Sequence, residues 1–319
     1  MSQAPVSLAQ SPGDSGRRLR GPFAEALGQL RHDRMGMIGL GCVLLVVGAG
    51  LFAPVLAAIA GQDPYTFHSD LIDAANGGQP IGPLGGVSST HWFGVEPQTG
   101  RDLFALVVYG IRTSVLIALG ATFLSVTFGV LLGLAMGYFG GVFEYVMGRF
   151  VDFMFGFPSL LFLIAIQLIV PPEFPRTVLL ALSLAVFGWV STARLIHGQA
   201  KSLVNRDFIE AARSTGTPPG RILRAEMLPN LVGTVAVITA LSFPTTISTA
   251  AGLSFLGVGV SPTTPELGRL IGQSVTWTYT GADVGFLLFP GAALLILMLG
   301  STLLGDALRD AFDVRMGER

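Results

Sequence analysis

The feature that most constrains this chain is a set of six windows in which no side chain is formally charged. The windows are 35–62, 113–143, 153–172, 177–193, 227–265 and 284–305. A helix needs about 20 apolar residues to cross the hydrocarbon core of a bilayer, and each window reaches or approaches that length. The whole chain is 51% hydrophobic and 12% charged, and its mean hydropathy is +0.65. This balance lies outside that of soluble domains. The sequence therefore predicts an all-α integral membrane protein with six transmembrane helices in a lipid bilayer.

Two windows depart from the ideal length. The window 177–193 is short, but Arg176 and Arg194 can extend their charged ends to the two membrane surfaces. The window 227–265 is long enough for two spans, and Pro244 lies inside it. A proline within an apolar helix favours a kink over a new turn, so we expect one helix there.

The basic residues predict the orientation of the spans. An even number of spans places both termini on one side of the membrane. Of the 19 basic residues, only Arg101, Arg112, Arg176 and Arg269 fall on the opposite side. Cytoplasmic loops carry the excess of Lys and Arg, so both termini are predicted to be cytoplasmic. The net charge of −1 gives no reason to expect a nucleic-acid partner.

These boundaries divide the chain into four parts. Residues 1–30 are rich in Ser, Pro, Gly and Arg and are predicted to be a disordered cytoplasmic tail. Residues 31–111 would form the first transmembrane helix and an extracytoplasmic segment. Residues 112–306 would form the transmembrane core, with a cytoplasmic loop at about 197–230. Residues 307–319 would be a cytoplasmic C-terminal tail.

The cytoplasmic loop contains a short charged helix with its own start and stop signals. Asp207 is predicted to cap it and Glu210 to complete a reciprocal capping box. Gly216 can end the helix in a left-handed conformation. The weakly apolar face at helical spacing consists of Phe208, Ala211, Ala212 and Thr215. Two turns of helix are not stable alone in water, so this segment is expected to dock against something.

Several kinds of chemistry are missing from the sequence. A nucleotide-binding P-loop needs Gly-Lys-Ser/Thr, whereas the only lysine, Lys201, follows Ala200. The four histidines show no metal-ligand spacing, and no hydrolase elbow or zinc-protease helix is present. The sequence thus predicts no catalytic residues, no metal site and no cofactor, and we do not expect an enzyme. Any driving force would come from another polypeptide.

The spans also lack an acidic or basic side chain near the bilayer centre, which an ion-coupled transporter usually keeps. Gln167 is the main polar residue deep in the third span. It could hydrogen-bond between helices or contact a substrate on the pathway. Gly129, Gly133 and Gly137 form a stripe of small residues on the second span. Such a stripe lets helices approach closely, either within this subunit or against a partner subunit.

Several sequence motifs of this chain resemble those of a known family. The run Glu210-Ala211-Ala212-x-x-x-Gly216 resembles the EAA motif of permease subunits of bacterial ABC importers. The chain as a whole resembles the C-type subunit of the dipeptide/oligopeptide/nickel permease family over about residues 31–315. Further matching runs include Arg34-Met35-Gly36-Met37-Ile38-Gly39, Phe52-Ala53-Pro54, Asp63-Pro64, His91-Trp92-Phe93-Gly94, Gly100-Arg101-Asp102, Tyr109-Gly110-Ile111-Arg112-Thr113-Ser114, Gly137-Tyr138-Phe139-Gly140-Gly141, Arg149 with Asp152, Leu253-Ser254-Phe255-Leu256-Gly257 and Leu304-Gly305-Asp306 with Arg309-Asp310.

The resemblance implies the type I ABC importer permease fold, in the bacterial cell membrane, with a cytoplasmic coupling helix. That helix would dock into a cleft of an ATPase subunit and transmit its closure to the spans. The residues that the resemblance assigns to it are Asp207, Phe208, Glu210, Ala211, Ala212, Arg213 and Gly216.

The implied partners are a homologous permease in a heterodimer, two ABC ATPase subunits and an extracytoplasmic solute-binding protein. The implied cargo is di- or oligopeptides, with nickel chelates or another small solute as the alternative. An ion-coupled secondary transporter is the alternative of a different class. Arg101 and Asp102 could hold the external loop, receive the binding protein, or form an ion pair inside the loop.

Overall fold

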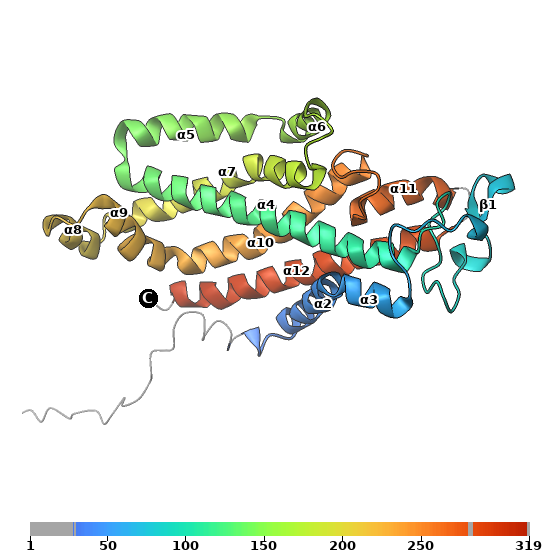
Figure 1. The fold of residues 1–319 in the computed structure, drawn as a ribbon. Coiled ribbons are helices and arrows are strands. Elements are labelled where there is room, and N and C mark those ends of the chain that lie inside the picture. The colour runs from blue at the N-terminus through green and yellow to red at the C-terminus, as the bar shows by residue number, and fades with distance from the viewer. Residues whose placement is uncertain (1–27, 29, 280–282, 318–319) are drawn as a thin grey trace, which may run out of the picture.

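The computed structural model describes residues 28, 30–279 and 283–317. The predicted disordered tail at 1–30 therefore lies outside the described residues, except for residues 28 and 30. The described chain forms an elongated helical bundle (Figure 1). The cytoplasmic elements α8 and α9 and the end of the chain lie at one end of it, and β1 and α11 lie at the other.

Five helices are long and apolar enough to cross a membrane within the described part of the chain. They are α2 (Arg34–Leu51), α4 (Leu103–Phe139), α7 (Arg176–Val204), α10 (Leu228–Phe255) and α12 (Gly285–Gly317). A bent pair of helices, α5 (Gly141–Gly156) and α6 (Ser159–Ile169), also passes this test, with an angle of 82° at the break. Counted as one span broken at Phe157 and Pro158, this pair brings the total to the six spans that the sequence predicts and is the third of them along the chain. As predicted, Pro244 lies inside a single helix.

The remaining elements lie outside these spans. On the outer side they are α3 (Ala53–Ala60), η1 (Ser69–Leu71), β1 (Ile72–Asp73), η2 (Ala74–Asn76), β2 (Gln79–Pro80), η3 (Pro83–Gly85) and α11 (Leu267–Tyr279). The two strands are antiparallel, with Ile72 opposite Pro80 and Asp73 opposite Gln79. On the cytoplasmic side they are α8 (Asp207–Ser214), α9 (Pro219–Arg221) and the π-helical segment η4 (Ile222–Met227).

Helix α4 begins earlier than the charge pattern predicted. Asp102 caps it, and its Oδ1 accepts a hydrogen bond from the Ala105 amide (2.7 Å). The boundary predicted between residues 111 and 112 therefore falls inside α4. Arg112 is exposed on the side of this helix and does not end it. With 37 residues, α4 is about 55 Å long, so it extends beyond the hydrocarbon core. Likewise, α12 continues without a break through residue 307 into the predicted tail.

The glycine stripe of α4 packs against α7 of the same subunit. A Cβ added at Gly129 would lie 2.6 Å from the Thr192 Cβ, and one at Gly137 would lie 2.5 Å from the Ala200 Cβ. Only glycine permits this approach of the two helices. Of the two readings left open by the sequence, the one observed in this chain is packing within the subunit.

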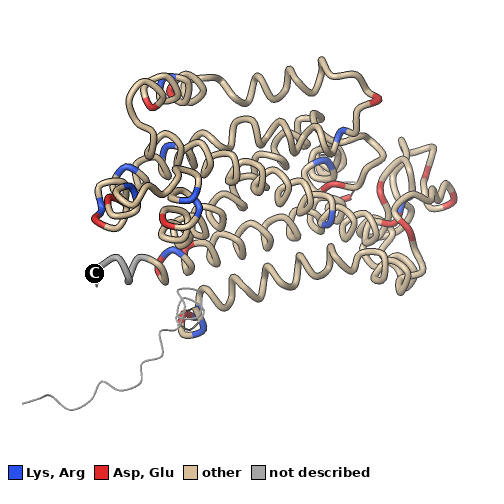
Figure 2. Tube along the Cα trace, turned by 60° about the vertical axis from the view of Figure 1, so that its left-hand side comes forward, with Lys and Arg blue, Asp and Glu red and all other residues tan. Residues whose placement is uncertain are grey.

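The broken third span is attached to α7 by ion pairs in its cytoplasmic half. Glu144 accepts hydrogen bonds from His197 Nε2 (2.8 Å) and from Lys201 Nζ (2.5 Å). Asp152 accepts one from Arg194 Nη2 (2.5 Å). Figure 2 shows the charged residues gathered at the two ends of the bundle, with a nearly charge-free middle. That distribution is the one expected of a protein whose middle lies in lipid.

Candidate functional site

The short helix predicted in the cytoplasmic loop is present as α8, but its predicted capping box is wrong. Arg206 has the extended backbone of the N-cap, and no side chain caps the helix. Asp207 takes the first helical position instead. The reason lies in the preceding turn, where the Arg206 amide bonds to the Leu203 carbonyl directly after α7 (3.0 Å). Asp207 and Glu210 both remain in the first turn, where negative charge favours the helix dipole.

Ile209 is the buried side chain through which α8 packs on the rest of the subunit. Its side chain is fully buried in an apolar cluster with Ile222, Met227 and Leu231. Of the weakly apolar face predicted from the sequence, Ala212 packs on the same cluster, whereas Phe208, Ala211 and Thr215 are exposed. The loop doubles back so that α8 meets η4, and this close approach selects Ile209. The sequence signal was an isolated branched apolar residue within a charged run.

The predicted end of α8 is confirmed. Gly216 has a φ of +73°, a conformation that glycine adopts without strain. Its amide bonds to the Arg213 carbonyl (2.9 Å), and the Thr217 amide bonds to the Ala212 carbonyl (3.1 Å). These two bonds form a Schellman motif. The chain therefore leaves α8 in a fixed direction.

The outward face of α8 is free within this subunit. Asp207, Phe208, Glu210 and Ala211 are all exposed, and the Phe208 side chain is exposed by 40%. Among the residues that the structure describes, the carboxylates of Asp207 and Glu210 have no hydrogen-bond or ion-pair partner. An apolar ring beside two unpaired carboxylates is chemically suited to a partner surface with an apolar socket and basic rim.

The face of α8 toward the bundle is fixed by Arg213 as well as by Ile209. The Arg213 guanidinium lies over the Tyr138 ring, 4.7 Å from its centre. Tyr138 belongs to α4 and packs on the same apolar cluster that buries Ile209. From α9, the chain enters α10 through the π-helical segment η4, whose Ile222 and Met227 are fully buried there. A displacement of α8 would thus reach both α4 and α10 through packed side chains.

The two extracytoplasmic residues singled out from the sequence are buried. Arg101 is 5% exposed and pairs with Glu96, Nε to Oε2 at 2.6 Å and Nη2 to Oε1 at 2.8 Å. Asp102 is 1% exposed, bonds to His91 Nδ1 (2.9 Å) and caps α4. Of the roles that the sequence allowed for Arg101, the one that the structure contains is the ion pair inside the loop. Contact of either side chain with another protein would require this loop to open.

Sequence reasoning missed a second buried polar group at the start of α11. Glu266 is fully buried and accepts hydrogen bonds from Ser114 Oγ and from the Arg269 amide, both at 2.8 Å. Burial raises the pKa of Glu266 and lowers that of Arg269. The available signal for these two residues was an acidic and a basic side chain flanking Leu267 and Gly268, between two charge-free windows.

Gln167 lies near the outer end of α6 and is 5% exposed. Neither its Nε2 nor its Oε1 has a hydrogen-bond partner among the described residues. The interhelical hydrogen bond that the sequence allowed is therefore not made within this subunit.

Taken together, the geometry defines a class: a helical, multi-pass membrane protein with a short cytoplasmic helix packed on its transmembrane bundle. Residues 129–318 match the family described as binding-protein-dependent transport system inner membrane component. Residues 21–76 match the N-terminal transmembrane domain of oligopeptide transport permease C. The chain belongs to this permease family.

Individual relatives agree over most of the chain. The dipeptide transport system permease protein DppC of Alkalihalophilus pseudofirmus is 33% identical, over 92% of this chain and 90% of the relative. The oligopeptide transport system permease protein OppC of Bacillus subtilis is 30% identical over the same shares. The glutathione transport system permease protein GsiD of Pectobacterium atrosepticum is 34% identical, over 85% and 87%. The MetNI methionine ABC transporter is a structural neighbour with a TM-score of 0.48 and 19% identity, covering 65% of this chain and 96% of that one.

Family membership confirms the class predicted from the motifs. The chain is a multi-pass inner-membrane permease subunit of an ABC importer, and it is not itself an enzyme. The family implies ATPase and binding-protein partners.

Proposed function

We propose that this subunit imports di- or oligopeptides, in a heterodimer with a homologous permease, and that α8 is the coupling helix. The support for the cargo is the set of relatives, two of which are named for dipeptide and oligopeptide transport. Glutathione, the cargo named for a third relative, is itself a peptide. Nickel chelates and other small solutes remain the alternative cargo.

The observation that supports the coupling role is the asymmetry of α8. One face is anchored by Ile209, and the opposite face leaves Phe208 and Glu210 free. A helix this short needs a docking surface on both sides to be held firmly. The subunit supplies only the inner one. An ATPase subunit would supply the outer one, and nucleotide-driven movement of that subunit would then push α8 against α4 and α10.

The coupling role is tested with Glu210→Lys and Phe208→Ala in the importer assembled with its ATPase and permease partners. We expect each variant to insert normally and to lose at least about tenfold in ATP-dependent uptake, because a charged contact or an interface aromatic is typically worth 1–3 kcal/mol. The matched control is Asp70→Lys, the same charge reversal at an exposed site at the outer end. Co-purification of the ATPase subunits measures assembly directly. Undiminished assembly and uptake in both variants would exclude α8 as the coupling helix.

The cargo is tested separately, by uptake into proteoliposomes containing the wild-type importer and its binding protein. Alanyl peptides of two to five residues, glutathione and a nickel chelate are compared. Peptide uptake that requires ATP supports the proposal. If only the nickel chelate is taken up, the cargo is the chelate and not a peptide. If this chain alone takes up solute under a proton or sodium gradient, the mechanism is ion-coupled transport and not ATP-driven import.

A further inference from the structure

Two exposed arginines share one carboxylate where α5 lies beside α7. Arg194 Nη2 in α7 donates to Asp152 Oδ1 in α5 at 2.5 Å, and Arg149 Nη1 lies 3.9 Å from Asp152 Oδ2. The Arg149 side chain is 70% exposed and the Arg194 side chain is 49% exposed. With two arginines and one aspartate, this arginine pair, Arg149 and Arg194, carries one positive charge in excess.

The arginine pair lies at the level where both helices leave the hydrocarbon core on the cytoplasmic side. The charge-free window of α7, 177–193, ends at Arg194, and the window 153–172 begins directly after Asp152. As a helix, the window 177–193 spans about 25 Å, slightly less than the core thickness of about 30 Å. Arg194 and Asp152 therefore mark the inner membrane surface. Figure 1 shows α5 on the outside of the bundle, over α4 and α7.

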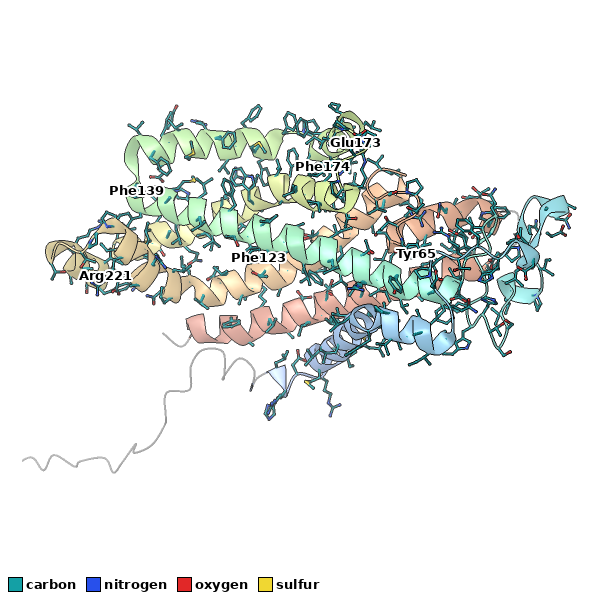
Figure 3. The ribbon with its side chains drawn as sticks, viewed as in Figure 1. Tyr65, Phe123, Phe139, Glu173, Phe174 and Arg221 are labelled. Atoms are coloured by element: carbon teal, nitrogen blue, oxygen red, sulfur yellow. The ribbon has the colours of Figure 1, made fainter. Side chains whose placement is uncertain are left out.

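Aromatic rings contact both guanidinium groups and surround them with apolar surface. Arg149 lies over the Tyr145 ring, 5.3 Å from its centre, and Arg194 over the Phe155 ring, 4.6 Å from its centre. Both rings are themselves more than half exposed. Figure 3 shows side chains of α5 projecting away from the bundle, beyond the turn that follows Phe139. Basic groups among exposed aromatic rings are typical of a membrane–water interface.

The arginine pair has donors to spare. A guanidinium has five N–H donors, and Arg149 makes no hydrogen bond to Asp152 at 3.9 Å. The nearest acid toward the cytoplasm, Glu144, already accepts hydrogen bonds from His197 and Lys201. Among the residues that the structure describes, no carboxylate other than that of Asp152 lies within ion-pair distance of either arginine. The free donors therefore suit an anion with several oxygens, and a phosphate matches the guanidinium fork.

We propose that Arg149 and Arg194 bind the phosphate of an anionic phospholipid in the inner leaflet, whose acyl chains lie along the exposed rings of α5. The excess positive charge favours a lipid with a net negative headgroup over a zwitterionic one. The site depends neither on the cargo nor on the role of α8. Because one arginine belongs to α5 and the other to α7, the bound lipid holds the cytoplasmic half of the broken span against α7.

The test is native mass spectrometry of the assembled importer in detergent. The importer is titrated with phosphatidylglycerol or with phosphatidylcholine of the same acyl chains. We expect phosphatidylglycerol to bind more tightly. Arg149→Gln and Arg194→Gln should each weaken its binding about fivefold, which corresponds to about 1 kcal/mol per basic residue near an anionic lipid surface. Binding of phosphatidylcholine, which is neutral overall, should change little.

Asp152→Asn separates charge from packing. It breaks the ion pair with Arg194 but removes the competing negative charge, so phosphatidylglycerol should bind at least as tightly as in the wild type. The matched control is Arg221→Gln, which removes an exposed arginine from α9, labelled in Figure 3, and should leave the binding unchanged.

Three results would refute the lipid site. The first is unchanged phosphatidylglycerol binding in the double variant Arg149→Gln/Arg194→Gln. The second is weaker binding in Asp152→Asn, because a loosened contact between α5 and α7 would then explain all the variants. The third is loss of the homologous permease on co-purification of the arginine variants, because this face would then be covered by protein and not by lipid.

Discussion

The two ends of this subunit are built in opposite ways. At the cytoplasmic end, α8 has one buried side chain, Ile209, and its carboxylates Asp207 and Glu210 are exposed and have no partner among the described residues. At the outer end, Arg101 and Asp102 are buried and paired, Arg101 with Glu96 and Asp102 with His91. A segment with few buried contacts can move as a unit. A segment cross-linked by buried ion pairs resists opening, since each charge left alone in the interior is costly. The difference indicates a movable cytoplasmic end and a rigid outer end.

The largest effect is expected from breaking the rigid end. Arg101→Met leaves the Glu96 carboxylate, 3% exposed, buried without its partner. Removing one member of a buried pair costs about 3–5 kcal/mol. We expect a clear fall in the thermal unfolding midpoint in detergent micelles.

Two further variants make that result interpretable. Arg112→Met removes an exposed arginine from α4 and should change stability by less than about 0.5 kcal/mol. Adding Glu96→Gln to Arg101→Met should restore part of the loss by removing the stranded charge. Equal midpoints for Arg101→Met and Arg112→Met would show that the outer ion pair does not stabilise the fold.

The next effect concerns the movable end. Ile209→Ala removes the anchor of α8, and truncating a buried isoleucine costs about 2–5 kcal/mol. Because α8 has little other attachment, we expect the loss to be local. Amide hydrogen exchange should accelerate over residues 207–216 and stay unchanged in α4, while the unfolding midpoint moves little. Uniform acceleration through the bundle would contradict the idea of a separately movable segment.

The smallest expected effect is a pH dependence that belongs to the outer end. Burial raises the pKa of Glu266 above its usual 4.5, so above that pH the folded state binds more protons than the unfolded state. Stability due to this group therefore falls as pH rises from 4.5 to its folded pKa, by at most about 1.4 kcal/mol per pH unit. Glu266→Gln should remove this slope and can keep the bond from Ser114. Identical slopes of unfolding midpoint against pH in wild type and variant would show that Glu266 does not titrate in this window.

Features of α8 that depend only on neighbouring residues could be predicted from the sequence, whereas features that depend on distant segments could not. The end of α8 at Gly216 could be predicted from the sequence, because a left-handed glycine and the nearby Pro218 stop a helix without help from distant residues. The Asp207 capping box failed because the turn after α7 shifted the start of the helix by one residue. The burial of Ile209 was not predicted, because η4, 13 or more residues away in the chain, decides which side chain of α8 is buried.

The sequence by itself determined the six spans, their orientation and the cytoplasmic position of α8. These follow from hydropathy and charge, which act on each segment separately against water and lipid. Only the tertiary structure decided that the Gly129 to Gly137 stripe packs on α7, that Glu266 and Arg269 are buried, and that the Gln167 amide is buried without a hydrogen-bond partner among the described residues. Burial and pairing depend on which distant segments meet, and no local pattern of residues carries that information.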